Sequence, residues 1–377
     1  MTTTNGLAAA LDHYGTLKSQ LVQYATGPIF QDHLTRFAQL HEDALQQGHI
    51  DLQAVVDQFV FNFRFDNDAT MAQRFAADQQ VNQRDAVLLQ AMDEGFQAFF
   101  EILQQDHEAD ALRIKCCFSD LEYTLMPTLP GGLSDPELAA GGFMSARITE
   151  VPGAGVWTPS GSLSVLPAAS GSQLVELVRQ QSMQHPEFSH RNPAYRQIAL
   201  ERSQRIHEYF VAAHGGHTLY APILQLVDAY VDAQLAPAAD NVPSDQREAT
   251  EKMLRASILD SELIGQRDVM LHSHPLAGLS FYSQIAELNQ LLYLGADLNP
   301  DEVERLRSFI QDDSTPAWLL GELVTEQLPF AEQALSLALD RPGFSWQAEG
   351  ELFLDSLPSE REPSLQLAIH SEFCRSL

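Results

Sequence analysis

The stretch GFMSARITEVPGAGVWTPSGSLSVLP, residues 142–167, constrains the fold most, because it predicts paired β-strands in a chain that is otherwise helical in pattern. Its apolar and alternating runs are short and are separated by turn-forming residues, which is typical of strands. Gly153, Gly155 and Gly161 punctuate it in the manner of a hairpin. We therefore expect a β unit that ends near Pro167.

The segments on either side have helical periodicity. One apolar stripe consists of Leu52, Val55, Val56, Phe59, Val60 and Phe63. These positions fall at i, i+3, i+4, i+7, i+8 and i+11, which is the spacing of one helix face. The period returns after Gln173, and a long helix is expected from Pro193 to about Ala213, since proline suits the first helical turn.

Between these helical regions, six short runs predict five or six strands: FQAFFEIL, ALRIKCCF, LEYTLMP, FMSARITEV, VWTPS and SLSVLP. So many strands in a short stretch suggest a small curled sheet or barrel. We expect an α+β protein, mainly helical, with this one β unit inserted between helical regions. The expected domains are an N-terminal helical bundle (1–93), the β unit (94–170), a helical connector (171–239) and a C-terminal helical domain (240–377).

The charge balance limits the partners. Lys and Arg total 22 against 51 Asp and Glu, so the formal net charge is −29. Such a surface repels nucleic-acid phosphates and anionic lipid. There is no apolar run of about 18 residues and no basic start followed by an apolar core, so we expect a cytoplasmic protein without membrane association. The adjacent Cys116 and Cys117 are expected to be small core residues rather than half of a disulfide framework.

Three segments together form a recognisable arrangement: FVFNFRFDNDAT at 59–70, the strand region with GFMSARI and VWTPSGSLSVLP, and HPEFSHRNPAYRQIALERSQRIHEYF at 185–210. The arrangement resembles an uncharacterised bacterial family, similar to the N-terminal part of SEC-C-motif proteins, over roughly residues 50–215. The resemblance implies a phenylalanine-rich helix, a small β unit and an entry into a long helix. The matching positions are Phe59, Phe63, Phe65, Asp66, Ala146, Arg147, Trp157, Ser160, Gly161, Pro167, Pro186, Arg191, Asn192 and Pro193.

The chain departs from that family at two kinds of position. Asn62 stands where members often have a tryptophan, and the C-terminal half holds Cys374 as its sole cysteine. The C-terminal zinc-binding SEC-C motif is therefore missing. Partner docking through that motif is not implied for this chain.

Arg147 and Trp157 are the candidate binding residues of the β unit. An arginine in an apolar strand usually requires a carboxylate partner, for which Asp66 and Glu150 are candidates. Trp157 is large enough to anchor a core. A cleft beside the two side chains would indicate a binding site for a small ligand or peptide, whereas a filled interior with Arg147 paired internally would indicate a structural role.

His272 and His274 are the candidate metal ligands. Residues at i and i+2 share one face of a strand, so both imidazoles could bind one zinc ion. The sequence His272-Ser273-His274-Pro275 resembles part of the metal site of JAB-type isopeptidases. The aspartate that should follow is missing, and Glu262, the available upstream acid, lies in a helical pattern. The alternative is a histidine-containing turn between helices.

His214-Gly215-Gly216-His217 is a second histidine pair. Two glycines after a long helix are typical of a helix C-terminus, so a cap is expected there. Metal binding is the other interpretation. A site that joins both histidine pairs requires the two segments to meet in space.

The chain contains no Gly-x-Gly-x-x-Gly motif, Walker loop or Gly-x-Ser-x-Gly elbow. This favours a non-catalytic cytoplasmic factor, adaptor-like or involved in assembly, that binds other proteins and requires no cofactor. The alternative is a divergent metal-dependent, JAB-like hydrolase that holds zinc at His272 and His274.

Overall fold

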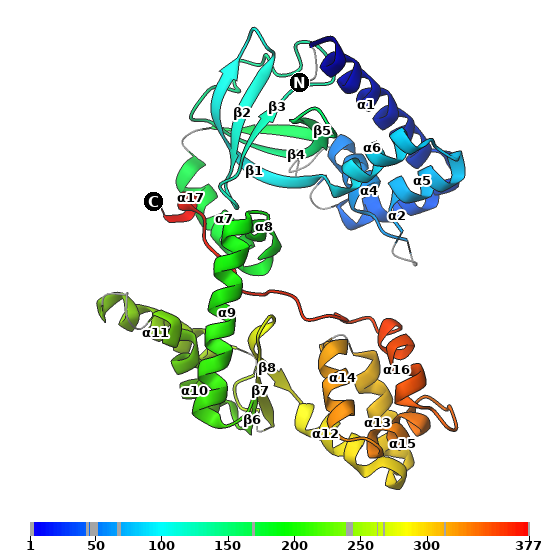
Figure 1. The fold of residues 1–377 in the computed structure, drawn as a ribbon, viewed down its shortest axis with the longest axis vertical. Helices are drawn as coiled ribbons and strands as arrows, with labels where there is room; N and C mark the ends of the chain where they lie inside the picture. Colours follow the sequence, from blue (N-terminus) through cyan, green and yellow to red (C-terminus); the bar gives the residue numbers. More distant parts are fainter. Residues whose placement is uncertain are drawn as a thin grey trace. The chain divides into compact units, whose positions relative to one another are not determined.

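The computed structural model describes residues 4–42, 45, 52–65, 69–167, 170–238, 244–261, 263–266, 268–312 and 314–375. Contacts divide the chain into two compact units, Met1–Asn192 with His370–Leu377 and Pro193–Ile369 (Figure 1). The boundaries expected at 93/94 and 170/171 mark changes of secondary structure within the first unit. They do not separate domains, because the N-terminal helices and the β unit pack on each other.

Five helices and one 3-10 turn precede the β unit in the described part of the chain. They are α1 (Thr4–Ala25), η1 (Pro28–Phe30), α2 (Gln31–Leu40), α4 (Leu52–Asn62), α5 (Met71–Gln79) and α6 (Gln83–Glu94). Of the predicted apolar stripe, Val55, Phe59 and Val60 are buried, whereas Leu52 is exposed at the start of α4. Aromatic side chains dominate the core that these helices share.

The β unit is a closed five-stranded barrel with strand order β1-β2-β3-β5-β4. Its strands are β1 (Phe96–Asp106), β2 (Ala111–Cys116), β3 (Glu122–Leu125), β4 (Phe143–Val151) and β5 (Val156–Leu166). Neighbouring strands are antiparallel except β3 and β5, which are parallel. The prediction of a mainly helical α+β protein with a small inserted β unit is confirmed.

The two runs VWTPS and SLSVLP form one strand, β5, instead of two. Gly161 lies within this strand and forms no turn. Its position is close to the Asp57 side chain and to Cβ of Arg147. The register of β4 against β5 shifts between Ala146 and Ile148, which is where a bulge bends the sheet. A Cβ at this position would lie in ordinary contact with the side chain of Asp57 on α4, which packs on this strand.

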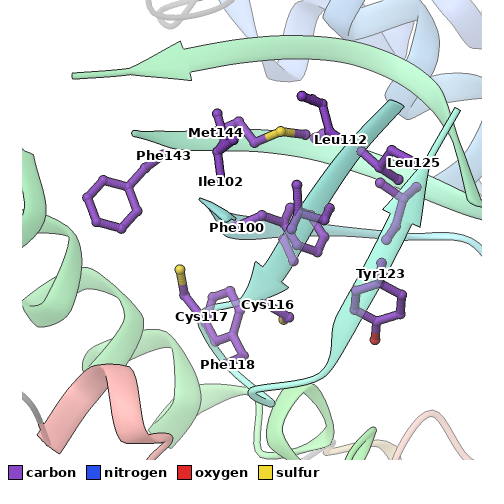
Figure 2. Packing of buried hydrophobic residues seen from close by; sticks show 14 of the residues in the cluster. Phe100, Ile102, Leu112, Cys116, Cys117, Phe118, Tyr123, Leu125, Phe143 and Met144 are labelled. Carbon is purple, nitrogen blue, oxygen red and sulfur yellow. The ribbon is translucent and has the colours of Figure 1, made fainter. Parts of the chain in front are cut away.

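The barrel interior is filled with apolar side chains. Figure 2 shows Phe100, Ile102, Leu112 and Met144 turned toward one another from three strands. The cysteines at 116 and 117 are free and buried in this core, as expected for small core residues. Within the glycine- and proline-rich stretch at 127–142, residues 129–141 are exposed except for two buried leucines that anchor it, Leu133 and Leu138.

Three further helices complete the first unit: α7 (Gly171–Gln184), α8 (Glu187–His190) and α17 (Glu372–Arg375). The last of these packs on α7, and Arg179 donates a hydrogen bond of 2.7 Å to the carbonyl oxygen of Cys374. The Ser371 hydroxyl donates to the carbonyl oxygen of Cys117. A short C-terminal segment is thus part of the barrel unit.

The second unit carries eight helices, two 3-10 turns and three strands among its described residues. They are α9 (Pro193–His214), β6 (Thr218–Ala221), α10 (Ile223–Leu235), η3 (Ala236–Ala238), α11 (Ser244–Leu259), β7 (Val269–His274), β8 (Gly278–Ser283), α12 (Ile285–Leu294), η4 (Gly295–Asp297), α13 (Pro300–Gln311), α14 (Ala317–Glu326), α15 (Phe330–Ala338) and α16 (Trp346–Asp355). The boundary expected at 239/240 falls inside this unit.

The antiparallel sheet of order β6-β7-β8 was not predicted. The interpretation of residues 272–275 as a turn between helices is wrong, since His272 and His274 belong to the central strand β7. Five consecutive residues of β7, from Val269 to Ser273, are buried, so the strand shows no apolar–polar alternation. The edge strand β6 has four residues, too few for a recognisable pattern.

The two faces of β7 contact different cores. Val269 and Leu271 pack with α9 and α10, whereas Met270 packs with the helices that follow the sheet. Because successive residues of a strand point to opposite faces, His272 and His274 lie on the same face as Met270. The sheet therefore presents both histidines to the helical layer that contains α14.

In this unit the sequence predicts two helix starts from a capping side chain followed by proline, Asn299-Pro300 and Thr315-Pro316, and the structure confirms the first of them. Asn299 caps α13 in a reciprocal capping box with Glu302. At α14 the N-cap residue is Pro316, without a side-chain cap, so Thr315 does not have the capping role that its sequence suggested. The polar composition of residues 240–246, with Pro243, predicts a hinge. Residues 240–243 lie outside the described residues, and α11 begins at Ser244.

No helix in the described ranges is both long enough and apolar enough to cross a bilayer.

Candidate functional site

Three side chains from separate elements converge in the second unit. His217 immediately precedes β6, His272 lies on β7 and Glu322 lies on α14. Each of them offers one ligand atom, and the three atoms lie within 4.8 Å of one another. The β6–β7 pairing brings the two histidines together, because Thr218 is the register partner of His272 and Ser273 donates its N–H to the carbonyl oxygen of His217 at 2.8 Å.

His272 is the most constrained member of the group. Its side chain is 4% exposed, and Nδ1 lies 3.1 Å from the Thr218 hydroxyl. The other ring nitrogen, Nε2, is buried and has no hydrogen-bond partner among the described residues. Burial, helped by the neighbouring histidines 217, 274 and 207, lowers the pKa of His272 to about 3. The ring is therefore neutral near pH 7, with a nitrogen available to a ligand.

Carboxylates face the two histidines from one side of α14. Glu322 Oε2 lies 3.6 Å from His272 Nε2, and Glu326 Oε1 lies 3.6 Å from His217 Nε2. Burial raises the pKa of Glu322 above its usual value. A neutral His272 does not form an ion pair with Glu322, so the 3.6 Å approach brings together two groups that could share a cation.

His274 does not belong to the group. Its Nδ1 accepts hydrogen bonds from the backbone N–H groups of Leu276 and Ala277, both at 3.1 Å. Its ring packs on the indole of Trp318, which also contacts the His272 ring. The pair predicted from the sequence is thus separated by its hydrogen bonds: His272 presents a free nitrogen to the carboxylates, while His274 holds the β7–β8 turn.

Two cavities adjoin the group. One of about 640 Å³ is lined by His274, Trp318, Thr325 and Trp346 together with the three converging residues and Glu326. A smaller one of about 220 Å³ is lined by Tyr220, Met270 and Asn289, again with the converging residues. The larger volume is in the range of small-molecule sites. The converging side chains therefore lie where a ligand could reach them.

The segment at 214–217 ends a helix and contributes one histidine to the converging group. Helix α9 ends at His214, and Gly215 follows with φ of +74°, as a helix C-cap requires. His214 packs on Phe210 and is not in the converging group, whereas His217 is. Glu262, the upstream acid considered from the sequence, lies outside the described residues.

Arg147 lies in the first unit, in the wall of the barrel, with 7% of its surface exposed. Its terminal nitrogens donate to Asn62 Oδ1 and to the carbonyl oxygens of Met92 and Asp93 at 3.1–3.3 Å. Its guanidinium lies over the Phe61 ring at 4.7 Å. Burial lowers its pKa to about 10.

The partners expected for Arg147 differ from those that the structure shows. Glu150 is exposed and is not among its hydrogen-bond partners, and Asp66 lies outside the described residues. The arginine instead donates to carbonyl oxygens at the C-terminus of α6. The last carbonyl oxygens of a helix lack intrahelical partners, and the helix dipole favours a cation beside them. This is the internally paired arrangement that indicates a structural role.

Trp157 is half-buried at the start of β5. Its ring packs edge-on against Tyr123 and Phe96, at centroid distances of 4.9 and 5.8 Å. These contacts are those of a core anchor. The two residues predicted to bind a ligand in the β unit are therefore both engaged in packing.

Sequence reasoning missed Glu322, because in so acidic a chain a carboxylate on a helix is ordinary. One signal was present: Trp318, Glu322 and Glu326 recur every four residues and so share one face of a helix. A tryptophan on that face indicates burial, which makes the adjacent carboxylates unusual. Pairing that face with His272 required the three-dimensional structure.

Comparison of the chain with protein-family models, with curated proteins and with solved structures finds no match.

Proposed function

We propose that residues 193–369 bind a zinc ion at His217, His272 and Glu322 and that this unit is a metal-dependent hydrolase. The observation that carries the proposal is His272 Nε2, a buried nitrogen without a partner that converges with a second imidazole and a carboxylate beside a cavity. A buried polar atom left without a hydrogen bond is costly, and a bound ion is one way to satisfy it.

The donor set fits this chemistry. Two imidazoles and one carboxylate are a ligand set of catalytic zinc sites, which keep a further position open for water or substrate. Zinc in such a site lowers the pKa of bound water to about 7. Burial keeps the His272 imidazole neutral, which is the protonation state that binds metal.

Side chains that contact the proposed ligands support the orientation of these ligands. The Thr218 hydroxyl holds Nδ1 of His272 and leaves Nε2 toward the carboxylates. Glu326 approaches His217 at 3.6 Å. Outer contacts of this kind fix ring orientation at metal sites and are typical of them.

Zinc titration of the full chain, followed by calorimetry and metal analysis, tests the proposal. We expect one zinc per chain and at least a hundredfold loss of affinity for His272→Ala or Glu322→Gln. The matched control is His274→Asn, whose Oδ1 can still accept the two backbone N–H groups, and it should bind zinc as the wild type does.

Two results would contradict the proposal. A wild-type protein that binds no zinc would remove the metal site altogether. Loss of zinc in His274→Asn equal to that in His272→Ala would restore the pair considered from the sequence and exclude the set with His217 and Glu322.

A non-catalytic assembly or adaptor role, through binding of other proteins, is the competing proposal, and a metal-free wild-type protein would favour it. We also propose a cytoplasmic location and no direct contact with nucleic acid. Three free, buried thiols at Cys116, Cys117 and Cys374 support the first, and the net charge of −29 supports the second.

A further inference from the structure

We infer that His274 donates a hydrogen bond to the carbonyl oxygen of the substrate, and that the substrate is an uncharged acyl compound, an amide or ester. The inference rests on the proposed function. It gives a role to His274, one of two histidines that line the cavity without belonging to the metal group.

The direction of the hydrogen bond follows from the backbone. Nδ1 of His274 accepts from two N–H groups, those of Leu276 and Ala277, so its lone pair is engaged and it carries no proton. The ring hydrogen must then be on Nε2. A histidine held in this way is a hydrogen-bond donor at Nε2 and cannot act there as a metal ligand.

The position of the donor follows from the strand. His274 lies two residues after His272 on β7, so both side chains are on the same face of the sheet. Trp318 packs against both rings, at centroid distances of 5.7 and 5.1 Å, and fixes them side by side. A substrate oxygen in the cavity can therefore approach the metal ligands and the donor together.

The charge of the cavity selects the substrate class. Its described lining includes Glu322, Glu326 and Glu351 and contains no lysine or arginine. Besides the proposed zinc ion, the described lining offers no cationic side chain to a phosphate or carboxylate group, and its three carboxylates repel such a group. A neutral carbonyl meets no such repulsion, and a neutral N–H donor stabilises the negative charge that develops on its oxygen.

The reaction that this implies is acyl hydrolysis. The oxygen of water bonds to the acyl carbon, and the bond from that carbon to the amine or alcohol breaks. The leaving group takes one proton of the water, and the other proton stays with the carboxylic acid that is formed.

Two variants of one residue separate donation from the structural role. His274→Asn keeps an acceptor near the position of Nδ1 and removes the donor at Nε2. His274→Gln can place an amide N–H near the position of Nε2 and removes the acceptor for the turn. Acetohydroxamic acid, which presents a carbonyl oxygen at a zinc ion, is the probe, and its binding to zinc-loaded protein is measured by calorimetry.

We expect His274→Asn to weaken acetohydroxamic acid about tenfold, with zinc affinity unchanged, and His274→Gln to remain within about threefold of wild type. The inference is overturned if His274→Asn binds the probe as tightly as wild type, if Gln and Asn weaken it equally, or if zinc-loaded wild type does not bind it. Failure to bind zinc would overturn the proposed function and this inference together, whereas any of the other outcomes overturns the inference alone.

Discussion

Each unit buries a nitrogen-bearing side chain on a β-strand, and the hydrogen bonding of the two side chains differs. Arg147 on β4 is 7% exposed and donates from both terminal nitrogens to three acceptors, although Nε has no partner among the described residues. The whole residue His272 on β7 is 3% exposed, and its Nε2 has no hydrogen-bond partner among the described residues. The acceptors of Arg147 come from the helices that pack on the barrel, whereas His272 faces carboxylates and a cavity.

Under the proposed function, the contrast is between a buried polar group that stabilises the fold and one that binds a metal ion. Hydrogen bonds from a charged donor to buried carbonyl oxygens stabilise the folded state, and removing the donor leaves those oxygens unsatisfied. A buried nitrogen without a partner contributes nothing of the kind to the metal-free protein. Substitutions at the two positions should therefore have opposite effects on stability.

The largest effect is expected at Arg147. Arg147→Ala removes three hydrogen bonds and the contact with Phe61, so we expect a loss of about 3 kcal/mol in the free energy of unfolding, measured by urea denaturation. Arg147→Lys should recover less than half of this, because an ammonium cannot span the acceptors of a planar guanidinium. Zinc affinity should not change in either variant, and a change there would mean that Arg147 acts beyond its own unit.

The next effect concerns zinc affinity. Thr218→Val removes the hydroxyl that lies 3.1 Å from His272 Nδ1 and keeps the shape of the side chain. Since outer contacts of metal-ligating histidines contribute 10- to 100-fold in affinity, we expect a loss of about tenfold, measured by calorimetry. An unchanged affinity would show that the orientation of His272 does not depend on Thr218.

How far these two positions could be predicted depends on what surrounds them. The barrel was predictable because its strands alternate or are bounded by glycine and proline, yet Gly161, which the sequence suggested as a break, lies inside β5, and β5 pairs with β4 on both sides of it. Strand β7 was not predictable, because it is buried on both faces. His272 was identified from its neighbour His274, but its convergence with Glu322 arises from packing of α14 on the sheet.

A smaller effect, of opposite sign, is expected at His272 itself. His272→Phe replaces the ring by an apolar one of similar shape and removes both the unpartnered Nε2 and the contact of Nδ1 with the half-buried Thr218 hydroxyl. In metal-free protein we expect no loss of stability and a gain of up to about 1 kcal/mol in urea denaturation, because a buried polar atom without a hydrogen bond is destabilising. The same variant should bind no zinc. A loss comparable to that of Arg147→Ala would mean that His272 is structural, which would remove the contrast between the units.

The smallest effect is expected at Arg113, an arginine of the same barrel that is exposed. Arg113 on β2 pairs with Glu122 on β3 at 2.7 Å, and both side chains are more than half exposed. Because water solvates both charges before and after the pair is broken, Arg113→Ala should cost less than about 1 kcal/mol. High salt should reduce the difference from wild type further, whereas the loss in Arg147→Ala should persist in salt, since buried groups are screened far less. Equal salt dependence of the two variants would show that water reaches Arg147. The hydrogen bonds of Arg147 to the end of α6 would then not explain why this arginine is buried.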